Sequence, residues 1–230
     1  MVAELELVRR ERWHPFKEVQ CVGNRALPMT NGFNRRCGAA LLFGGVLTIL
    51  INAILSPLLL SEHSQPSLEP ATTVFLVRQS ASGLVALLLI FGSLGLHLAQ
   101  RTASGVFGGI AFVTAFIGGC FLFGVEFTDV FVLRAVAQAS ADTYAAIDKN
   151  TFMTIGFASA AALFAIGWLL LSISVWRTGK LSRWAALTTF AGLFLIPALQ
   201  AGLGVVGAIV GNAVFGIGLA GLGWALTKLE

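Results

Sequence analysis

The sequence predicts an all-helical, polytopic membrane protein: a bundle of six transmembrane helices with both termini in the cytoplasm. Three observations lead to this prediction. The 230 residues are 57% apolar and only 11% charged, whereas a soluble globular chain carries roughly 25% charged residues. Five long stretches contain no Asp, Glu, Lys or Arg. Most positive charges lie in alternate connections between these stretches. The composition excludes a soluble single domain, a nucleic-acid-binding protein and a disordered chain.

Residues 1–36 are predicted to form a polar cytoplasmic tail. Pro15 and Pro28 interrupt this segment, and it lacks the short apolar core of a signal peptide. Each basic residue beside anionic lipid is attracted by about 1 kcal/mol, so the tail is expected to act as a topology signal and a surface anchor. Two starts of translation remain open, at Met1 or at Met29.

The five uncharged stretches define the predicted spans. A helix needs about 20 apolar residues to cross a hydrocarbon core of about 30 Å. The last stretch, 184–227, would be about 66 Å long as one helix, so we expect it to fold back. Pro197 and the run from Gln200 to Gly204 are predicted to supply the break. The transmembrane domain therefore covers 37–227, with spans near 38–60, 76–100, 104–126, 152–176, 184–199 and 204–226.

The distribution of lysine and arginine predicts the orientation. With the N-terminus inside, twelve of the fifteen Lys and Arg residues fall on the cytoplasmic side, and only Arg78, Arg134 and Lys149 fall outside. Cytoplasmic loops carry an excess of positive charge. Both termini are therefore predicted to lie in the cytoplasm, which requires the last uncharged stretch to cross the membrane twice.

The segment 126–149 is the longest predicted outer connection. It is rich in alanine, which predicts a helical extension of the third span or a helix on the outer surface, followed by a turn at 148–150. Glu126, Val130 and Arg134 have the spacing i, i+4, i+8, so we expect them to share one helix face as a local salt-bridge ladder.

Several short motifs resemble those of a known group of proteins. The matching residues are Gly95–Leu98, Glu126–Phe127, Gly167–Leu171 and Trp176–Leu187. In these motifs the chain resembles uncharacterised bacterial six-span integral membrane proteins, over about residues 35–226. The resemblance implies a multi-pass protein of the bacterial cytoplasmic (inner) membrane. It implies no activity and assigns no catalytic residue.

Polar side chains at the outer boundary form the first candidate site. Arg78 opens the second span, and Glu126 and Asp129 close the third, so we expect the three groups at similar depth. Ionisable groups in a membrane are costly and often functional. Two interpretations are open: an ion pair between Arg78 and a carboxylate, or an outer-facing vestibule for a polar or cationic ligand. The amides that could contribute to a vestibule are Asn52, Gln200 and Asn212.

Glycines of the sixth span form a second candidate site. Gly204, Gly207, Gly211 and Gly218 lie in this span, with Gly207 and Gly211 in GxxxG spacing. Small residues let helices approach closely in lipid. These glycines are expected to pack inside the domain or to receive a partner membrane protein or a second copy of the chain.

No catalytic, metal or cofactor motif is present. His97 is the one histidine within a predicted span, which excludes a haem held by two histidines of this chain. Ser82 has no base at matching depth on another span, and Cys21, Cys37 and Cys120 have no ligand spacing. The sequence therefore predicts no enzyme, no metal, no cofactor and no nucleic-acid partner.

Two functions remain as hypotheses. The first is a structural or accessory membrane subunit, or a homo-oligomer, that docks through its glycine-rich helix faces. The second is a small-solute carrier or channel that uses the outer polar cluster. A carrier requires Arg78, Glu126 and Asp129 and a polar cavity that reaches the middle of the bilayer, whereas a docking subunit does not.

Overall fold

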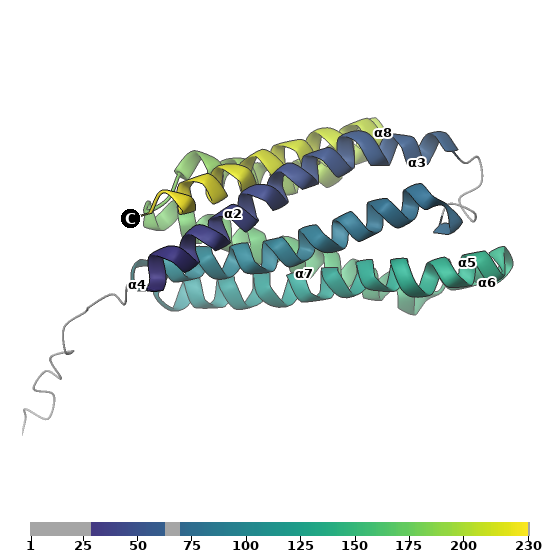
Figure 1. Cartoon of the computed structure of the whole chain (residues 1–230), viewed down its shortest axis with the longest axis horizontal. Helices are drawn as coiled ribbons and strands as arrows, with labels where there is room; N and C mark the ends of the chain where they lie inside the picture. Colours follow the sequence, from purple (N-terminus) through teal and green to yellow (C-terminus); the bar gives the residue numbers. More distant parts are fainter. Residues whose placement is uncertain (1–28, 63–69, 230) are drawn as a thin grey trace, which may run out of the picture. The chain divides into compact units, whose positions relative to one another are not determined.

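The chain forms helices because its long apolar stretches must satisfy their backbone hydrogen bonds internally. The computed structural model describes residues 29–62 and 70–229, which are helical with short connections and contain no strand. Figure 1 shows the helices side by side within the unit Asn31–Glu230. The elements are α2 Met29–Leu50, the π-helical turn η2 Ile51–Leu55, α3 Ser56–Glu62, α4 Thr73–Thr128, the π-helical turn η4 Asp129–Leu133, α5 Arg134–Ala139, α6 Ala141–Asp148, α7 Thr151–Thr178 and α8 Arg183–Thr227.

Four helical stretches within the described residues are long and apolar enough to cross a membrane. They are Gly32–Leu59, Thr73–Ala139, Thr151–Thr178 and Arg183–Thr227. Large apolar side chains on their surfaces are exposed, among them Phe152 and Val106 at 85% and 82%. This confirms the predicted helical class and is the pattern expected of a membrane protein, whose outer surface faces lipid.

Helix α4 turns back on itself at Gly105. This residue has φ 55° and ψ −148°, a conformation that is essentially restricted to glycine. The arms 73–104 and 106–128 run antiparallel. Two contacts show this: the rings of His97 and Phe112 stack with centroids 4.6 Å apart, and Ile90 lies against Gly119. The position of Gly105 agrees with the boundary predicted between the second and third spans.

Helix α8 turns back in the same way at Gly204, with φ 58° and ψ −133°. Thr189 lies against Gly218 and Ile196 lies against Gly211, so the arms 183–203 and 205–227 are antiparallel. The predicted fold-back is therefore present. The predicted contribution of Pro197 is wrong, since the chain stays helical through this residue and breaks at the glycine.

Polar side chains define where several helices begin. Thr72 accepts a hydrogen bond from the backbone N–H of Phe75 (3.0 Å) at the start of α4. Asn150 caps α7 by accepting from the N–H of Phe152 (2.9 Å), which confirms the turn predicted at 148–150. Ser182 caps α8 through the N–H of Ala185 (3.3 Å). Each cap satisfies a backbone donor that the first turn of a helix leaves without a partner.

The structure bears on two predicted segments, the polar tail 1–36 and the outer connection 126–149. Helix α2 begins at Met29, so residues 29–36 are helical although they were assigned to the polar tail. The rest of that tail, 1–28, lies outside the described residues. The segment 126–149 is helical, as predicted: the chain continues from α4 through η4 to Ala139, and α6 follows.

Close helix contacts depend on glycines. Gly167 of α7 faces the backbone of Ala115, and Gly118 of α4 faces the backbone of Phe164, so α7 lies directly against the second arm of α4. On the other side, α2 lies against the second arm of α8, where Gly45 meets the carbonyl of Gly216. Such contacts leave no room for a Cβ atom and are typical of helix packing in lipid.

Basic residues of the described chain gather at one end of this arrangement. Gly38 of α2 contacts Thr227 near the end of α8. Lys180, which precedes α8, donates to the hydroxyl of Thr102 beside the α4 turn (3.0 Å). Figure 1 shows α3, α5 and α6 at the opposite end. The first end carries the described basic residues that were predicted to be cytoplasmic: Arg35, Arg36, Arg101, Arg177, Lys180, Arg183 and Lys228.

Candidate functional site

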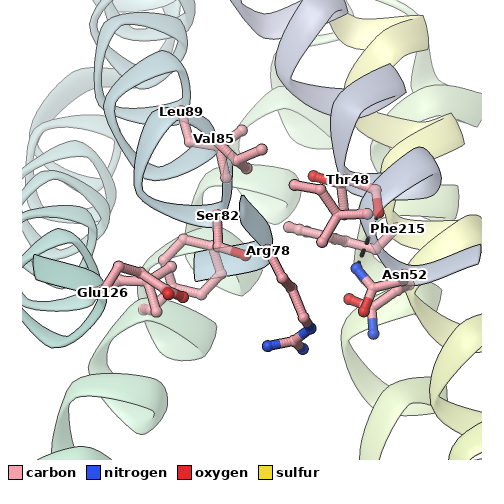
Figure 2. A pocket seen from close by; sticks show the side chains of 12 residues that line it. Thr48, Asn52, Arg78, Ser82, Val85, Leu89, Glu126 and Phe215 are labelled. Atoms are coloured by element: carbon pink, nitrogen blue, oxygen red, sulfur yellow. Dashed lines mark hydrogen bonds between the residues drawn. The ribbon is translucent and has the colours of Figure 1, made fainter. Parts of the chain in front are cut away.

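A pocket of about 250 Å³ opens among the four long helices. Figure 2 shows Arg78 of the first α4 arm between Glu126 of the second arm and Asn52 of η2. The residues that line the pocket are Thr48, Ile51, Asn52, Arg78, Ser82, Val85, Leu89, Leu122, Glu126, Phe164, Asn212 and Phe215. Its walls therefore combine one cation, one carboxylate and two amides with apolar side chains.

The pocket is deep. Arg78 and Leu89 are both in its lining, and they lie eleven positions apart on the helix, which is about 16 Å at 1.5 Å per residue. That length is roughly half of a hydrocarbon core of about 30 Å. Since Arg78 lies near the end of the arm that was predicted to face outward, the pocket extends from this end toward the middle of the predicted span.

The two asparagines are held by their own helices. The side-chain N–H of Asn52 donates to the carbonyl of Thr48 (2.9 Å), and that of Asn212 donates to the carbonyl of Ala208 (2.9 Å). Both bonds reach back four residues along the chain. Among the described residues, no donor is bonded to either Oδ1 atom. Each amide therefore contributes an available acceptor to the pocket.

Arg78 is tied to its surroundings by neutral groups. Its Nε donates to the hydroxyl of Ser56 (3.2 Å), and its Nη1 donates to Oε1 of Gln79. The amide of Gln79 in turn donates to Oδ2 of Asp129 (2.6 Å). In the described part of the chain, no ion pair joins Arg78 to Glu126 or Asp129. Instead of the ion pair that was one of the two expected interpretations, Gln79 connects Arg78 to the carboxylate of Asp129 by two hydrogen bonds.

Glu126 has an unsatisfied carboxylate oxygen. Its Oε2 is buried and has no hydrogen-bond partner within the described residues. Gly83 on the facing arm lies against the Cβ of Glu126 and the ring of Phe123, and a glycine contributes no polar side chain there. A buried acceptor without a donor is costly, and a ligand that supplied an N–H or O–H here would remove that cost.

Aromatic side chains close the inner part of the pocket. Phe164 and Phe215 line it, and Trp168 lies behind them with 1% of its surface exposed. The rings of Trp168 and Phe215 meet edge to face, with centroids 6.2 Å apart and an interplanar angle of 89°. Edge-to-face contacts of this kind are favourable, so the cluster forms a packed apolar floor.

Four of the six residues predicted for the outer cluster come together in the pocket lining: Asn52, Arg78, Glu126 and Asn212. Asp129 is outside the lining and reaches Arg78 only through Gln79. Gln200 does not join the site. It is exposed near the end of the first α8 arm, and the neighbouring Leu199 is the residue that faces Gly207.

Four further residues belong to the site or support it without having been predicted from the sequence: Gln79, Ser82, Phe164 and Phe215. Ser82 carried a usable signal, because it is four residues after Arg78 and so shares its helix face. Phe164 and Phe215 carried none, since the chain has 18 phenylalanines and only the tertiary contacts distinguish these two.

The predicted ladder of Glu126, Val130 and Arg134 is wrong. The π-helical turn η4 covers Asp129–Leu133, and its wider i to i+5 pattern shifts the face on which Arg134 emerges. Arg134 instead donates to the backbone carbonyls of Pro70 and Thr72. Its role in the structure is to hold the start of α4.

The glycines of the second candidate site are used inside the protein. Gly204 forms the α8 turn, and Gly207, Gly211 and Gly218 lie against the first α8 arm at Leu199, Ile196 and Thr189. These contacts correspond to the first of the two expected uses, packing within the domain. Among the described residues, no group of three or more His, Cys, Asp or Glu side chains is arranged to hold a metal ion.

Comparison of the chain with protein-family models, with curated proteins and with solved structures found no match.

Proposed function

We propose that the chain crosses the bacterial inner membrane six times, with both termini in the cytoplasm. Three features support this arrangement. Four helices are long and apolar enough to span a membrane. Two of them fold back at Gly105 and Gly204 into antiparallel arms. The basic residues at the end that holds Thr227 are the ones that the positive-inside rule assigns to the cytoplasm.

We further propose that the protein is a carrier or channel that takes up a small polar solute through an outward-facing vestibule. The pocket between the long helices carries this proposal. It brings Arg78, Glu126 and two amides to one cavity with an apolar floor, which would lie near mid-membrane in the proposed arrangement. Ligand sites are concave and mostly apolar, with a few polar groups that fix orientation, and this pocket has that composition.

The accessory-subunit hypothesis is the weaker proposal. It relies on the faces of Gly207, Gly211 and Gly218, and these faces lie against the other arm of α8. A partner could reach them only if that arm moved away. The pocket, in contrast, uses four of the six polar residues that the carrier hypothesis named.

Cysteine labelling tests whether the pocket contains water that is continuous with the outside. Ser82 lines the pocket, and Leu84 on the same arm is 45% exposed on the outer surface of the protein. Each is replaced by cysteine in a chain whose three native cysteines are serine. A membrane-impermeant thiosulfonate added to right-side-out vesicles should modify Ser82→Cys and leave Leu84→Cys unmodified, because lipid covers the second position.

A protection screen then tests solute binding. A solute that occupies the pocket should slow modification of Ser82→Cys, and the protection should disappear when Arg78→Ala or Glu126→Ala is added. Reaction of Leu84→Cys but not of Ser82→Cys with the impermeant reagent would contradict the vestibule.

A further inference from the structure

The hydrogen-bond acceptors of the pocket indicate what kind of solute it takes. The oxygen atoms of lining residues that have no donor within the described residues include Oε2 of Glu126, Oδ1 of Asn52 and Oδ1 of Asn212. The amide groups of both asparagines already donate to their own helices. A ligand that is rich in N–H donors matches these acceptors, and a ligand that is rich in acceptors does not.

The charges around the pocket favour a cation. Arg78 contributes one positive charge, and Glu126 and Asp129 contribute two negative charges. Two N–H groups of Arg78 donate to Ser56 and Gln79, and Gln79 connects the guanidinium to Asp129. Of these three charged groups, Glu126 is the one whose carboxylate has no hydrogen-bond partner at Oε2 within the described residues. A monovalent cation beside Glu126 would neutralise the excess negative charge, and buried charges are stable when they are paired.

The rest of the lining favours an organic body over a bare ion. Val85, Leu89, Leu122, Phe164 and Phe215 form the apolar part of the wall. Ring faces also attract ammonium groups. The volume of about 250 Å³ lies below the range of roughly 300–1,000 Å³ for drug-sized ligands, so the pocket accommodates a small molecule.

We propose that the pocket binds a protonated primary amine with a short apolar or aromatic body. The ammonium group lies against Oε2 of Glu126, and the body contacts Phe164 and Phe215. The amine class rests on the proposed vestibule, because the solute must reach Glu126 from the outer end.

Three probes of nearly the same shape separate the ligand classes: 2-phenylethylamine as cation, 2-phenylethanol as neutral isostere and phenylalanine as zwitterion. Binding to the full chain in mild detergent is measured by isothermal titration calorimetry. The amine should bind at least about tenfold more tightly than the alcohol, since hydrogen bonds to a charged group are stronger than neutral ones. This ranking requires no variant and is therefore independent of any folding defect.

Variants then locate the ammonium. Glu126→Gln should weaken amine binding by on the order of tenfold or more and leave the alcohol unchanged. Asp142→Asn is the matched control, because Asp142 is an exposed carboxylate of α6 outside the pocket lining, and amine binding should not change.

The amine proposal would be overturned by equal binding of the amine and the alcohol, by tighter binding of phenylalanine, or by the absence of amine binding. If phenylalanine binds more tightly than the amine and its binding depends on Glu126, the amine proposal fails but the proposed vestibule still stands. Failure of the vestibule itself would appear separately, as an unreactive Ser82→Cys.

Discussion

At the residue scale, Gln79 connects the guanidinium of Arg78 to the carboxylate of Asp129. It is 6% exposed, accepts from Arg78 on the first arm of α4 and donates to Asp129 of η4. The neutral amide lets one cation and one carboxylate share a bridge without direct contact. Glu126, three residues before Asp129 in the sequence, stays outside this bridge, and its Oε2 has no partner in the part of the chain that the structure describes.

Replacement of Gln79 by leucine should lower the stability of the folded protein. The change leaves Asp129 and Arg78 without their shared partner, and an unsatisfied buried polar group costs about 1–3 kcal/mol. The midpoint of thermal unfolding in detergent should therefore fall. Gln138→Leu is the control, since Gln138 is exposed on α5 and should change the stability by about 0.5 kcal/mol or less. Equal effects of both variants would show that the Gln79 bridge contributes nothing.

At the element scale, two glycines create the turns within α4 and α8. Both adopt positive φ angles, and each lies where an apolar stretch too long for one crossing reverses its direction. The sequence predicted both reversals, because the length of the uncharged segment 184–227 and the charge at Arg101 required them. It did not identify Gly204 alone, because Pro197 and Gly202 carry the same helix-breaking signal and only tertiary packing selects among them.

Gly105→Ala should destabilise the protein by about 1–3 kcal/mol, because a Cβ atom strains a backbone at φ 55° and ψ −148°. Gly109→Ala is the matched control in the same helix. A Cβ at Gly109 has nothing within 4 Å, so alanine should be neutral or stabilise the helix by up to about 1 kcal/mol. Denaturant titration followed by helical circular dichroism compares the two. Similar unfolding curves would contradict the turn at Gly105.

Close packing between the α8 arms gives a separate prediction. A side chain at Gly218 would collide with the backbone of Thr189, whereas Gly202 has open space around it. Overpacking typically costs about 1–3 kcal/mol, so Gly218→Leu should reduce the yield of monodisperse protein in detergent and Gly202→Leu should not. If Gly218→Leu behaves like the native chain while Gly202→Leu does not, the packing of α8 is different from that described here.

At the scale of the whole molecule, charged residues supply both the predicted orientation and the polar part of the pocket lining. The sequence grouped the outer polar residues by predicted depth alone, and the structure has Asn52, Arg78, Glu126 and Asn212 in one pocket lining. It could not tell which face of each helix points inward. Gln200 was therefore predicted as a member of the cluster, although it is exposed. The change of helix face at η4 could not be predicted either, because an extra residue in a helical turn does not change the composition.

The central claim is that α4 and α8 each cross the membrane twice, so that the pocket opens to the outside. Ala103, beside the α4 turn, and Gly202, beside the α8 turn, are both exposed and should lie on opposite sides of the membrane. Single cysteines at these positions, in a chain without native cysteines, are treated with an impermeant maleimide in right-side-out vesicles. The account predicts labelling of Gly202→Cys at once and of Ala103→Cys only after permeabilisation, whereas immediate labelling of Ala103→Cys would contradict it.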